Sequence, residues 1–372
     1  MNNYQSLLNS QTVLFNSNAT KPVAFRIAQL TKLKALLKNN EKALYEAIYA
    51  DFKKSEFETY ATELAILYAE INDALKNIKQ WSKRKYVKTN LANLPALSYI
   101  LPEPLGVTLV IGAWNYPYQL SFAPVIAAIA AGNTIVLKPS ELSAHTSALM
   151  ARLINTNFDA NYFKVVEGGV VETTALLDLP WNKLFFTGSV PVGKIVYQAA
   201  AKHLTPVTLE LGGKSPAIVT ANCNLKDTVK RLVWAKFLNA GQTCIAPDYV
   251  VVEANIHQAF ITAVQQQIEA YNYALENNNY VQIINTNNFN RLTALINTTQ
   301  VVAGGNTNAA ERYIAPTVLN NVTWTDAIMQ DEIFGPLLPI ITYTNINEVI
   351  THIKQRPKPL SCYVFTNDNK LK

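Results

Sequence analysis

Between residues 107 and 211, short apolar runs rich in β-branched residues alternate with longer stretches of helical character. The strand-like runs are residues 107–111, 134–137, 163–166, 184–186 and 207–211, and the helix-like stretches are residues 122–131, 143–155 and 193–202. A strand that is separated from the next by a helix returns through a crossover, and strands joined in this way run parallel. The alternation therefore predicts a doubly wound α/β lobe with a parallel sheet.

A second series of the same kind follows the glycine pair at residues 212 and 213. Its strand-like runs are residues 217–219 and 249–253, and its helix-like stretches are residues 225–238 and 256–271. We therefore predict an α/β protein with two doubly wound parallel-sheet lobes that divide near residue 211. The expected domains are residues 1–210 and residues 211–372.

The first 85 residues have a helical pattern, because leucine and isoleucine recur three and four residues apart. No glycine occurs before Gly106, which suits long helices. From about residue 86 to residue 103 the pattern changes to β-permissive residues between Pro95 and Pro102. We expect this segment to form an extended arm that leaves the first domain.

Composition excludes several classes of protein. Apolar residues make up 49% of the chain and charged residues 16%, which is not the composition of a disordered chain. The most apolar stretch, residues 120–131, is shorter than the roughly 18 residues of a membrane span, and the N-terminus lacks the pattern of a signal peptide. We expect a soluble, cytoplasmic protein.

Cysteine, histidine and net charge narrow the choice further. Three cysteines and four scattered histidines do not make a disulfide framework or a metal site. The net charge is +6, but the only dense basic run, residues 83–85, has no interleaved aromatic residues beyond Tyr86. We therefore expect no nucleic-acid partner, since net charge alone bears on solubility.

Two loops that follow predicted strands carry polar residues where open α/β sheets bind ligands. Asn115 follows the first strand, where its amide could donate to an oxyanion or could form an Asx turn before a helix. Lys138 and Glu141 follow the second strand and could hold a ribose or a phosphate. Alternatively, Ser140 caps a helix that has Glu141 in its first turn.

Two further motifs flank the end of the first lobe. Gly188, Ser189 and Gly193 lie between a strand and a helix, where backbone N–H groups can face a pyrophosphate, although the spacing is not that of the usual dinucleotide fingerprint. Glu210 lies on the apolar strand 207–211 and should lose solvation there, which suits a general base. The alternative for Glu210 is an ion pair with a nearby lysine.

Cys244 lies among small residues in the segment Asn239-Ala240-Gly241-Gln242-Thr243-Cys244-Ile245-Ala246-Pro247. A thiolate in a loop after a helix is accessible to substrate, so we interpret Cys244 as a nucleophile. Most lone cysteines are buried small hydrophobic residues, and that interpretation suits Cys223 and Cys362.

The order of these motifs, followed by Glu332-Ile333-Phe334-Gly335-Pro336, resembles the aldehyde dehydrogenase superfamily along essentially the whole chain. The segments Trp114-Asn115-Tyr116-Pro117, Lys138-Pro139-Ser140-Glu141 and Gly-Gln-Thr-Cys-Ile-Ala-Pro-Asp are similar to the class 3 or fatty aldehyde dehydrogenase branch. The resemblance implies NAD(P)-dependent oxidation of aliphatic or aromatic aldehydes to carboxylic acids. It also implies that the first lobe is a Rossmann-like NAD(P)-binding domain and the second a catalytic domain.

The resemblance implies a role for each matching residue. Cys244 would attack the aldehyde to form a thiohemiacetal and later a thioester, Asn115 would hold the oxyanion, and Glu210 would activate water as the general base. The implied cofactor is NAD, with NADP as the alternative. The residues implied in binding it are Lys138 and Glu141 at the adenosine ribose, Gly188, Ser189 and Gly193 near the pyrophosphate, and Glu332 and Phe334 at the nicotinamide ribose.

Members of this branch continue past the position of Lys372 and form dimers through an arm and a final strand. We therefore expect an incomplete chain, a homodimer of the full-length form, and an open question of membrane anchoring in that form. One alternative is a catalytically silent remnant that binds nucleotide at most. Another is an esterase or thioesterase activity that uses Cys244 and Glu210 without a cofactor.

Overall fold

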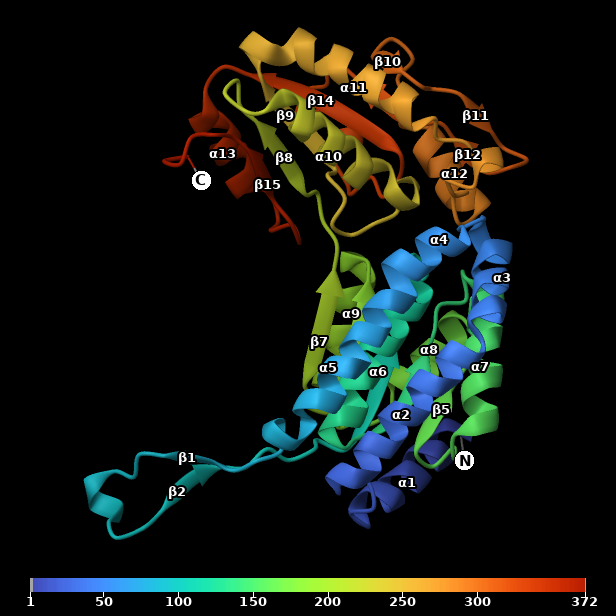
Figure 1. Ribbon diagram of the computed structural model, residues 1–372, viewed down its shortest axis with the longest axis vertical. Coiled ribbons are helices and arrows are strands. Elements are labelled where there is room, and N and C mark those ends of the chain that lie inside the picture. The colour runs from blue at the N-terminus through green and yellow to red at the C-terminus, as the bar shows by residue number, and fades with distance from the viewer. Residues whose placement is uncertain (1–2, 372) are drawn as a thin grey trace. The chain divides into compact units, whose positions relative to one another are not determined.

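The computed structural model describes residues 3–371, which form two compact units (Figure 1). Unit 1 comprises Met1–Ile48 and Glu56–Glu210, and unit 2 comprises Tyr49–Ser55 and Leu211–Lys372. No helix within residues 3–371 combines the length and the apolar content needed to cross a membrane. The same residues contain no cluster of three or more histidine, cysteine, aspartate or glutamate side chains that could hold a metal ion.

Helices form the first part of unit 1, as the spacing of leucine and isoleucine predicted. They are α1 (Asn3–Asn16), α2 (Val23–Asn39), α3 (Glu41–Phe52), α4 (Glu56–Thr59), a π-helical turn (Tyr60–Leu64) and α5 (Ala65–Trp81). Helix α2 packs against α5, and the leucines that recur along α2, such as Leu30 and Leu37, are fully buried. The last residues of α3 belong to unit 2.

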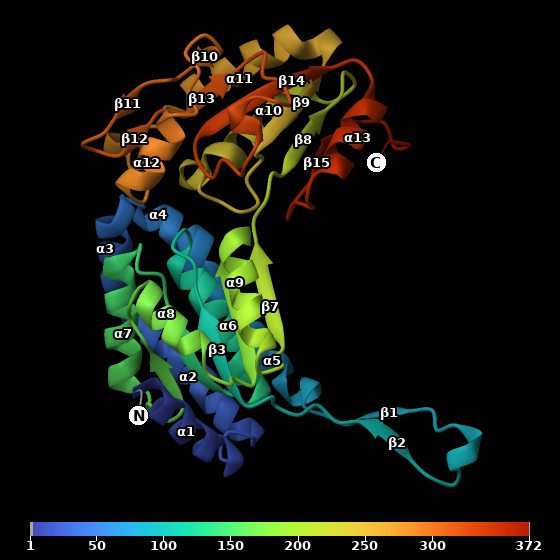
Figure 2. The same ribbon diagram turned by 180° about the vertical axis from the view of Figure 1, so that it is seen from behind.

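A parallel sheet forms the centre of unit 1, in the strand order β5-β4-β3-β6-β7. Its strands are β3 (Val107–Ile111), β4 (Thr134–Lys138), β5 (Phe163–Val165), β6 (Lys183–Gly188) and β7 (Val207–Leu211), and its crossover helices are α6 (Pro117–Ala131), α7 (Ala144–Asn157), α8 (Val170–Leu177) and α9 (Val190–Ala201). Strands β3 and β4 are buried along their whole length, as expected for a sheet covered on both faces. Figures 1 and 2 show helices on opposite sides of this sheet.

A short hairpin leaves unit 1 between α5 and β3. It consists of β1 (Lys85–Val87) and β2 (Ser98–Ile100), which pair antiparallel, with a 3-10 turn at Leu91–Asn93. Figure 1 shows the hairpin standing clear of the helices and the sheet of its unit. It occupies the segment in which the sequence predicts an extended arm.

Unit 2 contains a six-stranded sheet in the order β10-β13-β14-β9-β8-β15. Its strands are β8 (Pro216–Val219), β9 (Tyr249–Glu253), β10 (Val301–Ala303), β13 (Thr317–Leu319), β14 (Leu337–Tyr343) and β15 (Tyr363–Phe365). The helices are α10 (Leu225–Phe237), α11 (His257–Tyr271), α12 (Thr286–Thr293) and α13 (Ile346–Gln355), and a small ribbon is made of β11 (Thr307–Asn308) and β12 (Tyr313–Ile314).

The second sheet is mixed, which corrects one detail of the predicted parallel lobe. Strand β10 pairs antiparallel with β13, whereas the other four strand pairs of this sheet are parallel. The link from β10 to β13 carries the β11–β12 ribbon and no crossover helix. Without a crossover the chain turns back, so its edge strand runs in the opposite direction. The predicted α/β class with two largely parallel sheets is confirmed.

Candidate active site

In unit 1 several predicted site residues lie along one edge of the sheet. Strands β3, β4, β5 and β6 are parallel, so their carboxyl ends share that edge. Asn115 follows β3, Lys138 is the last residue of β4, and Gly188 is the last residue of β6. The carboxyl edge of such a sheet is where α/β proteins bind ligands. The structure thus gathers at this edge residues that are far apart in the sequence.

Asn115 lies in the loop between β3 and α6, and the residue is only 3% exposed. Tyr116 occupies the N-cap position of α6, and Pro117 is the first helical residue. Proline is well suited to this first position because the N–H that it lacks would have no partner within the helix. The loop that holds Asn115 is therefore bounded by a buried strand and a sharply defined helix start.

Glu63, which sequence reasoning missed, fixes the start of that helix. Its carboxylate is fully buried and accepts hydrogen bonds from the backbone N–H groups of Tyr118 (2.8 Å) and Gln119 (3.2 Å). A negative charge is favourable at a helix N-terminus, where N–H groups have no partner within the helix. Glu63 belongs to the π-helical turn, and the ordinary helical spacing of the sequence gives no sign of that turn.

Lys138 and Glu141 form an ion pair with 2.6 Å between Nζ and Oε2. The Lys138 side chain is 3% exposed, whereas that of Glu141 is 43% exposed. A buried amine therefore holds a carboxylate that remains accessible to solvent. Helix α7 begins at Ala144 with Ser143 as its N-cap. Glu141 therefore precedes the helix, and the alternative of a first-turn residue capped by Ser140 is wrong.

Gly188 and Ser189 form the junction between β6 and α9. Ser189 is the N-cap of α9, whose first residue is Val190. Gly193 is buried inside the first turn of the helix, where its N–H donates to the carbonyl of Ser189 (2.9 Å). The predicted glycine turn is thus reduced to Gly188 and Ser189. The first turn of α9 follows directly, and there Val190 and Val192 carry backbone N–H groups whereas Pro191 carries none.

Two glycines after β5, Gly168 and Gly169, also reach this edge, and sequence reasoning did not assign them. The N–H of Gly169 donates to Oε2 of Glu172 (2.7 Å) in the first turn of α8. The backbone N–H groups of Glu172 itself and of Gly169 lower the pKa of the Glu172 carboxyl. Glycines therefore lie just before both helices at this edge of the sheet, Gly169 before α8 and Gly188 before α9.

The donor set at this edge fits a dinucleotide. The start of the twelve-residue helix α9 offers backbone N–H groups to a pyrophosphate. The half-exposed carboxylate of Glu141, held by Lys138, offers acceptors to ribose hydroxyl groups.

Glu210 lies on β7 with its side chain exposed. This corrects the expectation that an apolar strand desolvates its carboxylate. The physical reason is the strand order, since β7 is at the end of the sheet of unit 1 and has a neighbouring strand on one side only. The assignment of Glu210 as the general base therefore depends on access to water rather than on burial.

In unit 2, Cys244 lies on a turn between α10 and β9. The side chain is half-buried, and the N–H of Ala246 donates to the carbonyl of Thr243 (3.0 Å) across the turn. Gln242, two residues earlier, is fully buried, and its Oε1 accepts the backbone N–H of Ile284 (3.0 Å). The buried amide anchors the segment that carries the thiol, a role that sequence reasoning missed.

The backbone just before this turn is left-handed at three consecutive residues. The φ angles are 53° at Asn239, 50° at Ala240 and 71° at Gly241. A Cβ at Gly241 would lie 2.3 Å from the carbonyl oxygen of Gly335, so only glycine fits there. This contact joins the segment of Cys244 to the segment that carries Glu332.

The other two cysteines differ from Cys244. Cys223 is half-buried, whereas Cys362 is exposed, so the expectation of a buried small residue is wrong for Cys362. It lies immediately before β15, which is the edge strand of the second sheet.

Glu332 lies half-buried in the segment between β13 and β14, beside two glycines. A Cβ at Gly212 would lie 2.4 Å from both carboxylate oxygens, and the N–H of Gly213 donates to the carboxylate. Burial raises the pKa of Glu332 to about 7, although the Gly213 N–H and the charges of Lys214 and Lys236 act in the opposite direction. Phe334, two residues later, is left-handed with φ 51°.

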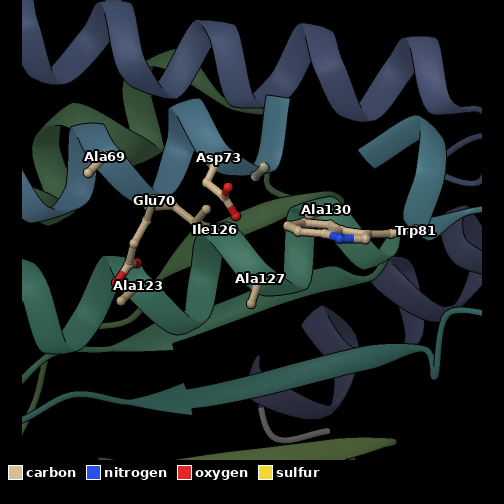
Figure 3. Close-up of a pocket in the computed structure, with 9 residues that line it drawn as sticks. Ala69, Glu70, Asp73, Trp81, Ala123, Ile126, Ala127 and Ala130 are labelled. Atoms are coloured by element: carbon tan, nitrogen blue, oxygen red, sulfur yellow. The ribbon is translucent and has the colours of Figure 1, made fainter. Parts of the chain in front are cut away.

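A groove of about 400 Å³ lies elsewhere in unit 1, between α5 and α6 (Figure 3). Its floor is made mainly of alanines, and Glu70, Asp73 and Trp81 of α5 also line it. Burial raises the pKa of Glu70. None of the residues that line the groove is a predicted site residue, so this groove is separate from the candidate active site.

Comparisons with known proteins identify the family of the chain. Residues 9–371 match the family model described as aldehyde dehydrogenase family. The chain is 48% identical to 4,4'-diaponeurosporen-aldehyde dehydrogenase of Staphylococcus aureus over 99% of this chain and 81% of that protein. It is 42% identical to the mouse aldehyde dehydrogenase described as dimeric and NADP-preferring, over 100% of this chain and 82% of that protein.

A solved structure of Staphylococcus aureus AldH in a substrate-bound state has the same fold. It superimposes with a TM-score of 0.97 at 47% identity and covers 100% of this chain and 82% of that chain. Sequence, motif order and fold thus lead to one conclusion: the chain belongs to the aldehyde dehydrogenase family.

Proposed function

We propose that the chain oxidises aliphatic or aromatic aldehydes to carboxylic acids with NAD(P) as hydride acceptor. The observation that carries the proposal is the position of Cys244, a half-buried thiol on a turn anchored by the buried Gln242, in a chain of the aldehyde dehydrogenase family. A nucleophile must be held still and yet remain accessible, and this turn meets both requirements.

In the first step Sγ of Cys244 attacks the carbonyl carbon and forms a thiohemiacetal. The carbonyl oxygen gains negative charge, and the proposal assigns its stabilisation to the side-chain amide of Asn115 and the backbone N–H of Cys244. Removal of one such donor typically costs about 3–4 kcal/mol of transition-state stabilisation. The low exposure of Asn115 supports this role, because a hydrogen bond to charge is stronger away from water.

Cofactor binding is assigned mainly to unit 1, which we take as the NAD(P)-binding domain. Lys138 and Glu141 would hold the adenosine ribose, Gly188 and Ser189 the pyrophosphate, and Gly193 would support the start of α9. From unit 2, the catalytic domain of the proposal, Glu332 and Phe334 would hold the nicotinamide ribose. When bound, the cofactor supplies an acceptor for the hydride of the aldehyde carbon.

The oxidised carbon remains as a thioester on Cys244, which water must cleave. Glu210 is the proposed general base, since it removes a proton from that water and lets the hydroxide displace the thiolate. Its exposed position on an edge strand supports access to water. The products are the carboxylic acid and the free Cys244 thiol.

The choice between NAD and NADP depends on Glu141. A carboxylate at the ribose repels a 2′-phosphate, which favours NAD, yet a mouse relative is described as NADP-preferring. We therefore propose NAD with NADP as an accepted substitute. The same relative is described as dimeric, and we propose a homodimer for this protein.

The test is formation of reduced nicotinamide by the purified chain, with hexanal and benzaldehyde against both NAD and NADP. A Cys244→Ala variant run in parallel should lose all turnover. Cofactor binding without turnover would favour a nucleotide-binding protein that lacks catalysis. Absence of both turnover and binding would refute the proposal, and ester hydrolysis alone would favour a cofactor-independent hydrolase.

A further inference from the structure

The segment of unit 2 that carries Glu332 is held by charged side chains rather than by regular secondary structure. It runs from the end of β13 to the start of β14, and its one helical element is the 3-10 turn Ala327–Met329. Backbone turns hold part of this segment, such as the bond from the N–H of Met329 to the carbonyl of Asp326 (2.9 Å), and side chains bond other parts of its backbone. The structure shows which side chains do so.

Lys214 bonds this segment at two places. Its Nζ donates to the carbonyl oxygens of Ile328 (2.9 Å) and Asp331 (2.8 Å), and Asp331 is the residue immediately before Glu332. Lys214 itself follows Gly213, whose N–H donates to the Glu332 carboxylate. Two adjacent residues, Gly213 and Lys214, therefore hold the carboxylate and the backbone that carries it.

Asp248 holds the backbone on the C-terminal side of Glu332. Its Oδ2 accepts a hydrogen bond from Nζ of Lys214, and its Oδ1 accepts the N–H of Ile333 (2.8 Å), the residue immediately after Glu332. Both charged side chains are nearly buried, with exposures of 9% for Lys214 and 4% for Asp248. Glu332 is thus held by contacts to the residues on either side of it.

Asp248 also belongs to the segment of the nucleophile. It follows Cys244 by four residues, at the start of β9, and its own N–H donates to the carbonyl of Ser215 (2.8 Å). One carboxylate therefore connects the segments of Cys244, Lys214 and Glu332 within unit 2. A buried ion pair is rarely a net gain in stability, because the charges lose their hydration. A positional role gives a reason for such a pair at this point.

We propose that Lys214 and Asp248 are positioning residues, which hold Glu332 in the place required for cofactor binding and fix it relative to the segment of Cys244. The inference rests on the proposed role of Glu332 in that function. Arg291 adds a further bond, from Nη2 to the carbonyl of Ile333 (2.8 Å), and it also interacts electrostatically with Asp248. Lys214 and Asp248 are the ion pair whose bonds join the segment of Glu332 to the segment of Cys244.

The test compares Lys214→Met, Asp248→Asn and the double variant with the wild-type chain. The readouts are the Kd of NAD, the KM for NAD and kcat with hexanal, hydrolysis of p-nitrophenyl acetate by Cys244 without cofactor, and thermal unfolding. Lys202→Met is the matched control, since Lys202 pairs with Asp178 in an exposed ion pair. A small misplacement of a binding group costs up to about a hundredfold, so we expect the Kd and KM for NAD to rise about tenfold or more in Lys214→Met.

Ester hydrolysis by Lys214→Met should stay within about twofold of wild type, because this cofactor-free reaction does not need Glu332. The Lys202→Met control should stay within the same range of about twofold in every readout. Removal of one partner of a buried pair destabilises more than removal of both. The double variant should therefore regain unfolding stability while its Kd for NAD remains raised. If ester hydrolysis, NAD binding and stability fall together and recover together in the double variant, the role is structural and the proposal is overturned.

A double-mutant cycle with Glu332→Gln tests whether Lys214 acts through Glu332. The effects of Lys214→Met and Glu332→Gln on the Kd of NAD should be strongly non-additive. Additive effects, or an unchanged Kd in a folded Lys214→Met variant, would overturn the inference and leave the proposed function intact. Failure of the wild-type chain to bind NAD would instead count against the proposed function first, and against the inference with it.

Discussion

At the scale of single residues, the proposed chemistry depends on one thiol. We predict that Cys244→Ala abolishes aldehyde oxidation, because the first covalent bond of the proposed reaction forms on its sulfur. The Kd of NAD, measured by calorimetry, should change by less than about threefold, since the proposed cofactor residues are untouched. Cys223→Ala is the matched control and should keep wild-type turnover. Oxidation by the folded Cys244→Ala variant would remove Cys244 as the nucleophile.

The raised pKa of Glu332 gives a second residue-level prediction. Burial moves the pKa of this carboxyl from 4.5 to about 7, so the folded state holds the proton more tightly than the unfolded state does. The contribution of Glu332 to stability is therefore fully present below about pH 4.5 and is lost as the pH rises through about 7.

Glu332→Gln removes the loss of stability at high pH, because the amide carries no charge, and it keeps an oxygen that can accept the Gly213 N–H. At pH 8 the variant should be more stable than wild type by up to about 3 kcal/mol, and at pH 5 the difference should nearly vanish. Urea unfolding at both pH values measures this. If Glu332→Gln and wild type differed in stability by the same amount at both pH values, burial of the charge would not be the cause of the difference. Weaker NAD binding by Glu332→Gln would show that the buried charge serves cofactor binding.

Residues of the site differed in how far the sequence could predict them. Cys244, Lys138 and Glu141 lie in local motifs, so their neighbours in sequence are enough to suggest a role. The role of Lys214 depends on Asp331, which is 117 residues away, and that of Gln242 depends on Ile284, 42 residues away. A single sequence carries no information on such contacts, because any buried polar residue can be satisfied by many distant partners.

At the scale of elements, the buried carboxylate of Glu63 holds the start of α6, and the loop that carries Asn115 leads into that helix. We predict that Glu63→Ala leaves the N–H groups of Tyr118 and Gln119 without their acceptor and lowers stability by about 1–3 kcal/mol. The loop of Asn115 precedes this helix, so kcat should fall as well. Glu46→Ala on α3, which removes an exposed carboxylate, is the control and should change both quantities little. Wild-type stability and kcat in Glu63→Ala would contradict this account.

The elements themselves follow from periodicity where burial is complete. The predicted strand 107–111 coincides with β3, whose five residues are all buried. Helix α12 and strand β10 were missed, because residues 272–308 are rich in asparagine and show no regular apolar spacing. The asparagines act locally instead, as at Asn285, whose side chain accepts the N–H of Asn288 and caps α12. Capping of this kind is visible in the sequence only once the helix is known.

At the scale of the whole molecule, the hairpin of β1 and β2 is difficult to explain in a single chain. Two-stranded ribbons are marginally stable by themselves, and this one exposes large apolar side chains. Leu91 is 88% exposed and Leu97 is 82% exposed, and Tyr86, Leu94 and Ile100 are also exposed. Apolar residues concentrated on so small an element indicate that another surface covers them. The proposed homodimer supplies one.

We therefore predict that Leu91→Ser combined with Leu97→Ser shifts the protein from dimer to monomer. Each leucine that becomes buried contributes about 1.5–3 kcal/mol, so loss of two weakens association by about a hundredfold or more. Light scattering over a concentration series measures the shift. Leu204→Ser is the control, because Leu204 is equally exposed, at 89%, but lies after α9 and outside the hairpin. If the double variant dimerises as the wild type does, the hairpin does not form the dimer interface. A wild-type chain that is already monomeric would contradict the proposed homodimer. In either case the apolar surface of the hairpin would belong to a different partner.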